Sequence, residues 1–191
     1  MIPPLVTPRL FLRPLELADA EETQALFPDW EVVKYLAGVV PWPYPSDAAL
    51  TYIRDLALPA IARGDEWHWT LRLKTAPERL IGFVSLRRVE WHNRGFWIAP
   101  PWQRQGLMSE AAAAVTDFWF DVLREPVLRT SKAVLNSGSR RISEKQGMRL
   151  VGACESRYVS GTLPTEQWEI TAEEWRARRA LGWRARRRQP Q

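Results

Sequence analysis

The chain has 191 residues, of which 46% are hydrophobic and 26% are charged, a composition typical of a globular protein and not of a disordered or membrane-embedded one. Its formal net charge of +5 comes from residues 172–191, which contain seven Arg and two Glu, while the rest of the chain carries 20 basic and 20 acidic side chains. The basic excess therefore belongs to one end of the chain and does not indicate a nucleic-acid partner.

The single cysteine and the N-terminus indicate the compartment. Cys154 has no partner for an internal disulfide, which is typical of a reducing environment, and we interpret it as a packing residue. The sequence shows no signal-peptide pattern and no run approaching the ~20 apolar residues of a membrane span. We therefore expect a cytoplasmic protein without a membrane partner.

One domain is expected over residues 1–181, and an Arg-rich tail over residues 182–191 is expected to be disordered.

The first third of the chain is expected to form one strand followed by helices. Alternation predicts a strand over residues 10–13, and Asp19 and Ser46 are candidate helix caps. The helices are expected at residues 19–27, 29–37 and 47–63, with a loop rich in Pro and aromatic residues between the last two.

The rest of the chain is expected to form a mixed sheet with crossing helices. Residues 66–73 alternate between apolar and polar side chains, as in a half-buried strand, and strands at 80–90 and 95–99 complete an antiparallel meander. Because a helix at 103–123 crosses to the next strand at 127–135, that strand is expected to be parallel to its predecessor. The remaining elements are expected to be helices at 136–146 and 171–180 and a hairpin at 149–160 and 166–170.

One strand-to-helix junction has the pattern of an anion site. Pro100 and Pro101 end the apolar strand, and Gly106 stands just before the helix, where the backbone must come close to something. The first N–H groups of a helix have no partner inside it and carry partial positive charge. This junction therefore favours binding of a phosphate or pyrophosphate.

The same junction resembles the pyrophosphate-binding motif of the GNAT acetyltransferases. That family has Gln/Arg-x-x-Gly-x-Gly/Ala where this chain has Gln103-Arg104-Gln105-Gly106-Leu107-Met108, so Met108 departs from the pattern. The RimJ/RimL-type branch has Trp-x-x-x-Gly-x-x-Thr/Ser-Glu-Ala, and here Trp102, Gly106, Ser109, Glu110 and Ala111 occupy those places. The opening Pro-Arg-Leu-x-Leu-Arg-Pro over residues 8–14 is also similar to this branch.

A second motif about 30 residues later strengthens the resemblance. The branch pattern Asn-x-x-Ser-x-Arg-x-x-Glu-Lys-x-Gly-Phe is matched by Asn136, Ser139, Arg141, Glu144, Lys145 and Gly147, with Met148 in the last place. Two motifs in the right order, each at a strand-to-helix junction, are much more specific than either alone. Together with the N-terminal pattern, the resemblance extends from Pro8 to Trp175.

The resemblance implies a fold and a cosubstrate. The implied α/β architecture is the GNAT fold, a mostly antiparallel sheet of six to seven strands that splays between two central parallel strands, with helices on both faces. The implied cosubstrate is acetyl-CoA, with its pantetheine arm against the backbone of Trp97, Ile98 and Ala99. Its pyrophosphate would lie on the turn formed by Gln103, Arg104, Gln105, Gly106, Leu107, Met108 and Ser109. Asn136, Ser139 and Arg141 belong to the same implied site, and Arg104, Arg140 or Arg141 could add phosphate contacts.

Acetyl transfer to an amine then needs a base, an oxyanion donor and a group that meets the leaving thiolate. Glu90 and His92, at a strand end, are candidates for the base, and Glu66 and His68 face one way on the neighbouring strand. Backbone near Ile98 or Ala99 is the candidate oxyanion donor. The family's usual thiolate partner is a Tyr at the place of Ser143, so we interpret Ser139 as the better candidate and Ser143 as the alternative. No metal-binding cluster is visible.

The function that follows is an acetyl-CoA-dependent N-acetyltransferase acting on a primary amine by direct attack, as a monomer or homodimer. The acceptor remains open between a protein N-terminal α-amine, a polyamine, an aminoglycoside and an amino acid. A neutral body argues weakly against polycations. The alternative from another class is a non-catalytic CoA- or partner-binding module with the same fold.

Overall fold

The computed structural model describes residues 2–187, and side chains as far as Leu181. Its strands are β1 (Leu5–Val6), β2 (Leu10–Pro14), β3 (Glu66–Leu73), β4 (Ala76–Arg87), β5 (Arg94–Ile98), β6 (Val127–Ala133), β7 (Arg149–Tyr158) and β8 (Gly161–Thr171). Its α-helices are α1 (Ala20–Leu26), α2 (Trp30–Val33), α3 (Ala48–Tyr52), α4 (Leu58–Arg63), α5 (Leu107–Asp117), α6 (Ser137–Gln146) and α7 (Ala172–Arg187). Short 3-10 turns occupy Leu17–Asp19 and Pro100–Trp102, and wider π-type turns occupy Ile53–Ala57 and Phe118–Val122.

The strands form two antiparallel sheets whose edges meet. The first sheet has the order β1-β2-β3-β4-β5 and the second has the order β6-β8-β7, so β5 and β6 are facing edge strands. They join only where the turn before β5 meets β6, through Asn93 N–H to the Arg129 carbonyl (3.0 Å) and Ser131 N–H to the Trp91 carbonyl (2.7 Å). Beyond this junction no ladder between β5 and β6 occurs within residues 2–187.

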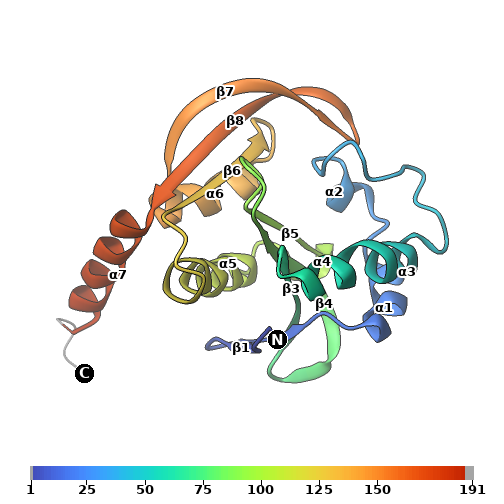
Figure 1. Ribbon diagram of the computed structural model, residues 1–191, viewed down its shortest axis with the longest axis horizontal. Coiled ribbons are helices and arrows are strands. Elements are labelled where there is room, and N and C mark those ends of the chain that lie inside the picture. Colours follow the sequence, from blue (N-terminus) through green and yellow to red (C-terminus); the bar gives the residue numbers. More distant parts are fainter. Residues whose placement is uncertain (1, 188–191) are drawn as a thin grey trace.

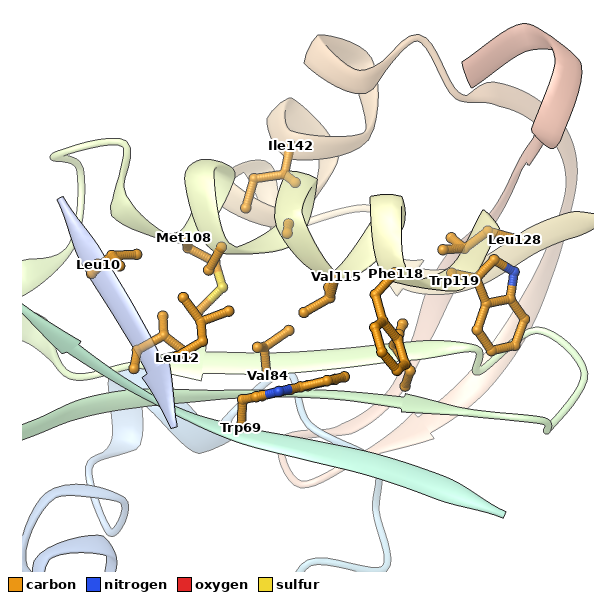
Figure 2. Close-up of a cluster of buried hydrophobic side chains, with 14 of the residues drawn as sticks. Leu10, Leu12, Trp69, Val84, Met108, Val115, Phe118, Trp119, Leu128 and Ile142 are labelled. Carbon is orange, nitrogen blue, oxygen red and sulfur yellow. The ribbon is translucent and has the colours of Figure 1, made fainter. Parts of the chain in front are cut away.

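Helices cover both faces of the first sheet. Figure 2 shows α5 packed on one face, with Val115 and Phe118 lying over Trp69 and Val84 of the strands. Helices α1 to α4 cover the opposite face, where Phe83 and Trp97 belong to a second buried cluster. Both faces are therefore buried, and on β3 the face toward α1 to α4 carries the buried polar side chains of His68, Thr70 and Arg72.

The hairpin β7–β8 forms an arch (Figure 1). It extends over β6 and α6 and reaches the segment after α2. There Gly38 N–H donates to the Arg157 carbonyl (2.9 Å), Val159 N–H to the Leu36 carbonyl (3.0 Å) and Ser160 N–H to the Lys34 carbonyl (3.2 Å). A Cβ on Gly38 would lie 2.7 Å from Arg157 Cγ, so this close approach requires glycine. We call this junction of residues 34–38 and 157–160 the arch contact.

The α/β class, the antiparallel meander and the helices on both faces are confirmed, and three details are corrected. Residues 2–187 contain eight strands where six to seven were expected. The expected central parallel pair is not a hydrogen-bonded ladder, because β5 and β6 diverge into separate sheets and each described strand pair is antiparallel. The last helix, expected to end at Ala180, continues to Arg187, and residues 188–191 lie outside the described part.

The helix expected over residues 47–63 is interrupted for a physical reason. Pro59 lacks an N–H group, and its ring collides with the carbonyl four residues earlier in a regular helix. The preceding turn, Ile53–Ala57, is accordingly π-type, and a regular helix resumes with Pro59 in its first turn. Gly64, with a φ of 78°, then ends the helix, as the sequence predicts.

Candidate active site at the split between the sheets

Strand β5 presents unpaired backbone groups along its open edge. Ala99 N–H donates to the Ile81 carbonyl of β4 (3.0 Å), so the backbone groups of alternate residues, Phe96 and Ile98, face the other way. The Ile98 carbonyl accepts a hydrogen bond from the Gln103 side chain on this side (3.0 Å). The side chains of Trp97 and Ala99 are buried on the face away from α5. The split therefore offers an extended ligand one strand edge to pair with.

The turn from β5 to α5 is shaped by two left-handed residues. Arg104 has a φ of 60° and Gly106 a φ of 77°, a region that glycine adopts without cost and other residues rarely adopt. The first α5 bond runs from Glu110 N–H to the Gly106 carbonyl (3.1 Å), which leaves the N–H groups of Leu107, Met108 and Ser109 without helical partners. We call residues 103–109 the cradle.

The cradle's side chains separate into two groups. Leu107 and Met108 are buried in the core against the sheet, so only their backbone can serve a ligand. Arg104 and Gln105 are exposed, and Gln105 donates to the Pro101 carbonyl (2.9 Å), which braces the turn. Because Met108 points into the core, it fills the family's small-residue position without covering the N–H groups.

Arg9 is a cationic side chain at the cradle that the sequence analysis did not assign to the site. Its Nη1 donates to the Gln105 carbonyl (2.9 Å), and its Nη2 lies 3.5 Å from where a Cβ on Gly106 would stand. Its Nε donates to Glu110 (2.7 Å), and Glu110 also accepts from Arg9 N–H (2.8 Å) and Thr7 (2.5 Å). Partial burial alone would raise the pKa of Glu110, but the bonds from Thr7 and Arg9 outweigh it and lower that pKa. The Pro-Arg-Leu pattern at residues 8–10 was the available signal.

Helix α6 begins on the β6 side of the split. Asn136 caps it by accepting a hydrogen bond from Ser139 N–H (3.1 Å), as a helix start requires. Ser139 is half-buried and Arg141 exposed, whereas Ser143 is completely buried and its hydroxyl has no hydrogen-bond partner among the described residues. Arg140 is held by Glu166 of β8 (2.8 Å), which leaves it less free for a phosphate than Arg141.

The two candidate bases lie at the junction of the two sheets. Glu90 is 72% exposed and lies 3.9 Å from Arg129. His92 bridges to Thr130 of β6, and burial, with Arg87 nearby, lowers its pKa. The neutral form of His92 is therefore available near pH 7, and both His92 and Glu90 are exposed. Within residues 2–187, no group of three or more His, Cys, Asp and Glu is arranged to hold a metal ion. In the same range no helix has both the length and the apolar character to cross a membrane.

A free strand edge next to a glycine-containing helix start is the arrangement of a site for an extended, phosphate-bearing ligand. The family model described as an acetyltransferase (GNAT) domain matches residues 9–149, and the chain belongs to the GNAT acetyltransferases. Members of this family are N-acetyltransferases that use acetyl-CoA. No curated protein matches the chain by sequence.

Solved structures share the fold at low sequence identity. The ribosomal-protein-S5-alanine acetyltransferase of Vibrio fischeri has a TM-score of 0.76 at 12% identity, covering 91% of this chain and 98% of that one. RimJ of Mycobacterium smegmatis, solved with CoA-disulfide, has a TM-score of 0.74 at 18% identity, covering 91% and 88%. A GNAT-family acetyltransferase of Bacillus anthracis has a TM-score of 0.73 at 19% identity, covering 90% and 99%.

Proposed function

We propose that the protein is an acetyl-CoA-dependent N-acetyltransferase that acetylates a primary amine, with a protein N-terminal α-amine as the favoured acceptor. The observation that carries this proposal is the pairing of two sets of free backbone donors. The open edge of β5 suits an amide-bearing arm, and the cradle, with Arg9 beside it, suits a pyrophosphate. The edge and the cradle follow one another along the chain, in the order in which pantetheine and pyrophosphate are joined in CoA.

The residues of the split fit this cosubstrate. A Cβ on Gly106 would meet only Arg9 within 4 Å, so the turn has open space beside Gly106. The cradle N–H groups and Arg9 would hold the pyrophosphate, with Arg104 and Arg141 as further exposed cations. Acetyl-CoA supplies an acetyl group already activated as a thioester. Direct attack by the amine in a ternary complex then needs no enzyme nucleophile.

Three groups of this chain would serve the transfer. The expected donor at Ala99 is wrong, because its N–H is bonded to the Ile81 carbonyl; the N–H of Ile98, with that of Phe96 on the same edge, can donate to the developing oxyanion. The hydroxyl of Ser139, at the start of α6, is the candidate proton donor to the leaving sulfur. The acceptor must also lose a proton before attack; Glu90 and His92, the two candidates expected at the strand end, are both exposed side chains, so neither is favoured over a buried base.

The arch contact favours an acceptor with a free end. Leu36 and Val159 pack against the buried cluster that contains Trp97, on the face of β5 opposite α5. Because the arch contact is closed by hydrogen bonds, the middle of an acceptor polypeptide cannot pass through it. The terminus of an acceptor polypeptide, or a small molecule, can enter beside it. The RimJ/RimL-type pattern and the V. fischeri neighbour, a ribosomal-protein acetyltransferase, support a protein N-terminus over a small amine.

A screen of thiol release tests the proposal. Acetyl-CoA is incubated with N-terminal peptides, a polyamine, an aminoglycoside and free amino acids, each with and without the protein. We expect acceptor-dependent CoA release with peptides and an N-terminal acetyl group by mass spectrometry. Release with a small amine alone would replace the favoured acceptor. Binding of acetyl-CoA without turnover of any amine would leave the alternative of a non-catalytic CoA-binding module.

A further inference from the structure

A row of polar residues crosses the first sheet from its open edge. In the strand register, Gly95 of β5 is opposite Ser85 of β4, and Ser85 is opposite His68 of β3. Residues directly opposite on antiparallel strands have Cβ positions about 4.5–5.5 Å apart. Because Trp69 points toward α5 (Figure 2), its neighbour His68 points to the other face, the one covered by α1 to α4.

The imidazole of His68 is fully buried and is held by a carboxylate. Its Nε2 lies 2.5 Å from Oε2 of Glu66, so Nε2 carries the proton and donates it to that carboxylate. Nδ1 is then an unprotonated acceptor, and it is buried without a hydrogen-bond partner. A buried acceptor left unpaired costs stability and calls for an explanation.

The surroundings keep this imidazole neutral. Burial lowers the pKa of His68, Glu66 opposes that decrease, and Arg87 adds to it. The other side chains near the ring are Tyr52 of α3 and Phe83 of β4. Burial also raises the pKa of Tyr52, so near pH 7 the charged groups around His68 are Glu66 and Arg87.

Ser85 lies between His68 and the open edge of β5 in the strand register, and its hydroxyl makes no hydrogen bond to Nδ1 of His68 in this structure. The Arg87 Nη2 donates to Ser85 Oγ (3.3 Å), which leaves the hydroxyl proton of Ser85 free to be donated elsewhere. The same guanidinium nitrogen lies 3.2 Å, and Ser85 Oγ 3.3 Å, from where a Cβ on Gly95 would stand. The positive charge therefore stands directly over β5, where it disfavours the ammonium form of a nearby amine.

We propose that Ser85, His68 and Glu66 form a proton relay that deprotonates the acceptor amine; the proposal rests on the acetyltransferase function proposed above. The ammonium gives one proton to the Ser85 hydroxyl while Ser85 passes its own proton to Nδ1 of His68, each step directly after rotation of the hydroxyl or through a water. Glu66 stabilises the resulting imidazolium and, being 22% exposed, leads the proton to solvent. The second proton lost by the amine ends on the CoA thiol, so each turnover releases one proton.

His68 acts through Ser85 and does not touch the acceptor, because two strand spacings of about 4.8 Å separate it from β5. Its role predicts a pH signature. His68→Gln should lower kcat/KM for the amine ~10²-fold at pH 7, a small loss for a positioned base. The loss should shrink above pH 9, where bulk amine is already neutral. Glu66→Gln should show a smaller loss with the same pH trend, and Glu78→Gln, an exposed carboxylate on β4, should show none.

Three measurements keep this test decisive. The rise in Tm produced by acetyl-CoA should be the same in His68→Gln and Glu66→Gln as in the wild type, which shows that both variants are folded. Nitrogen-15 NMR of the wild-type protein, which has only two histidines, should find His68 protonated at Nε2. Protonation at Nδ1, or an unchanged pH–rate profile in His68→Gln, would overturn the relay while leaving the function intact. If the wild type acetylates no amine, the proposed function fails and the relay fails with it.

Discussion

Ser139 and Ser143 occupy one motif on α6 but have different surroundings. Ser139 is half-buried at the helix start, whereas Ser143 is completely buried with an unpaired hydroxyl. If Ser139 meets the leaving sulfur, the interaction exists mainly in the transition state. Ser139→Ala should then lower kcat ~10²-fold with little change in acetyl-CoA affinity. Single-variant measurements of kcat and the acetyl-CoA Kd check this.

Ser143→Ala is the matched comparison. Its hydroxyl cannot reach solvent, and removing an unpaired buried polar group should stabilise the fold by roughly 1 kcal/mol. We expect kcat close to that of the wild type and a higher midpoint in urea. A larger kcat loss in Ser143→Ala than in Ser139→Ala would show that Ser143 has taken the place of the family's Tyr.

Lys132 of β6 is buried without a carboxylate in hydrogen-bond contact. Its Nζ donates to Thr130 (2.8 Å) and lies 5.5 Å from the centre of the Trp168 ring. Burial lowers the pKa of Lys132 to about 7, Arg94 adds to the decrease, and Glu166 opposes it. In the unfolded chain the same lysine keeps its proton up to about pH 10. Between about pH 7 and pH 10 the unfolded state binds more protons than the folded state. The free energy of unfolding should therefore rise with pH in this range, by up to about 1.4 kcal/mol per pH unit.

The substitution Lys132→Met tests this dependence. The variant should be more stable than the wild type at pH 7, and its advantage should disappear as the pH approaches 10. Urea unfolding at several pH values measures both, and Lys74→Met, at an exposed position, serves as the control. A constant difference between wild type and Lys132→Met would mean that Lys132 titrates normally.

In the cradle, the effect of a substitution on ligand binding can be distinguished from its effect on backbone strain by comparing two glycines. Gly106→Glu should abolish the rise in Tm caused by acetyl-CoA, because a carboxylate would stand where the pyrophosphate binds. The substitution also strains the backbone, since φ is 77°. Gly64 has nearly the same φ, 78°, with nothing near its Cβ position, so Gly64→Glu carries the strain alone. Gly64→Glu should keep the ligand-induced shift, and a preserved shift in Gly106→Glu would refute the cradle.

Local pattern was sufficient for most elements and for the pairing within the meander, but not for the separation of the two sheets. Alternation over residues 66–73 predicts the bounds of β3 that the structure has, but the expected half-burial is wrong, because residues 68–72 are buried on both faces of the strand. The separation of β5 from β6 has no local signature, since it depends on how two sheets twist apart. The π-type turn at Phe118–Val122 was likewise not predicted, and no proline marks it.

The same distinction applies to the site. The cradle is contiguous in sequence, so a turn, a glycine and a helix start were enough to predict it. The row of Gly95, Ser85 and His68 is spread over three strands, and only the register brings its members together. Alternation placed Glu66 and His68 on one face of a strand, but it could not show that Ser85 and Gly95 continue the row. Arg9 reaches the cradle from a turn almost 100 residues away.

At the scale of the molecule, α7 connects the second sheet to the helix that carries the cradle. It leaves β8 and packs beside the end of α5 (Figure 1). Trp175 is 5% exposed, and its indole N–H donates to Asp117 (2.8 Å). Arg178 donates to the Lys145 carbonyl at the end of α6 (2.7 Å), and Arg179 pairs with Asp121 (2.8 Å). One helix thus contacts the ends of both helices that border the split.

These contacts predict where the chain can be shortened. Ending it after Leu181 keeps Trp175, Arg178 and Arg179, so Tm and acetyl-CoA affinity should be nearly unchanged, although the helix continues to Arg187. Ending it after Thr171 removes the buried Trp175 and should cost about 3–5 kcal/mol, the usual loss when a large aromatic side chain leaves a core. Urea unfolding and acetyl-CoA titration of both truncations measure this. A clear loss in the shorter deletion would show that residues beyond 181 also dock on the body.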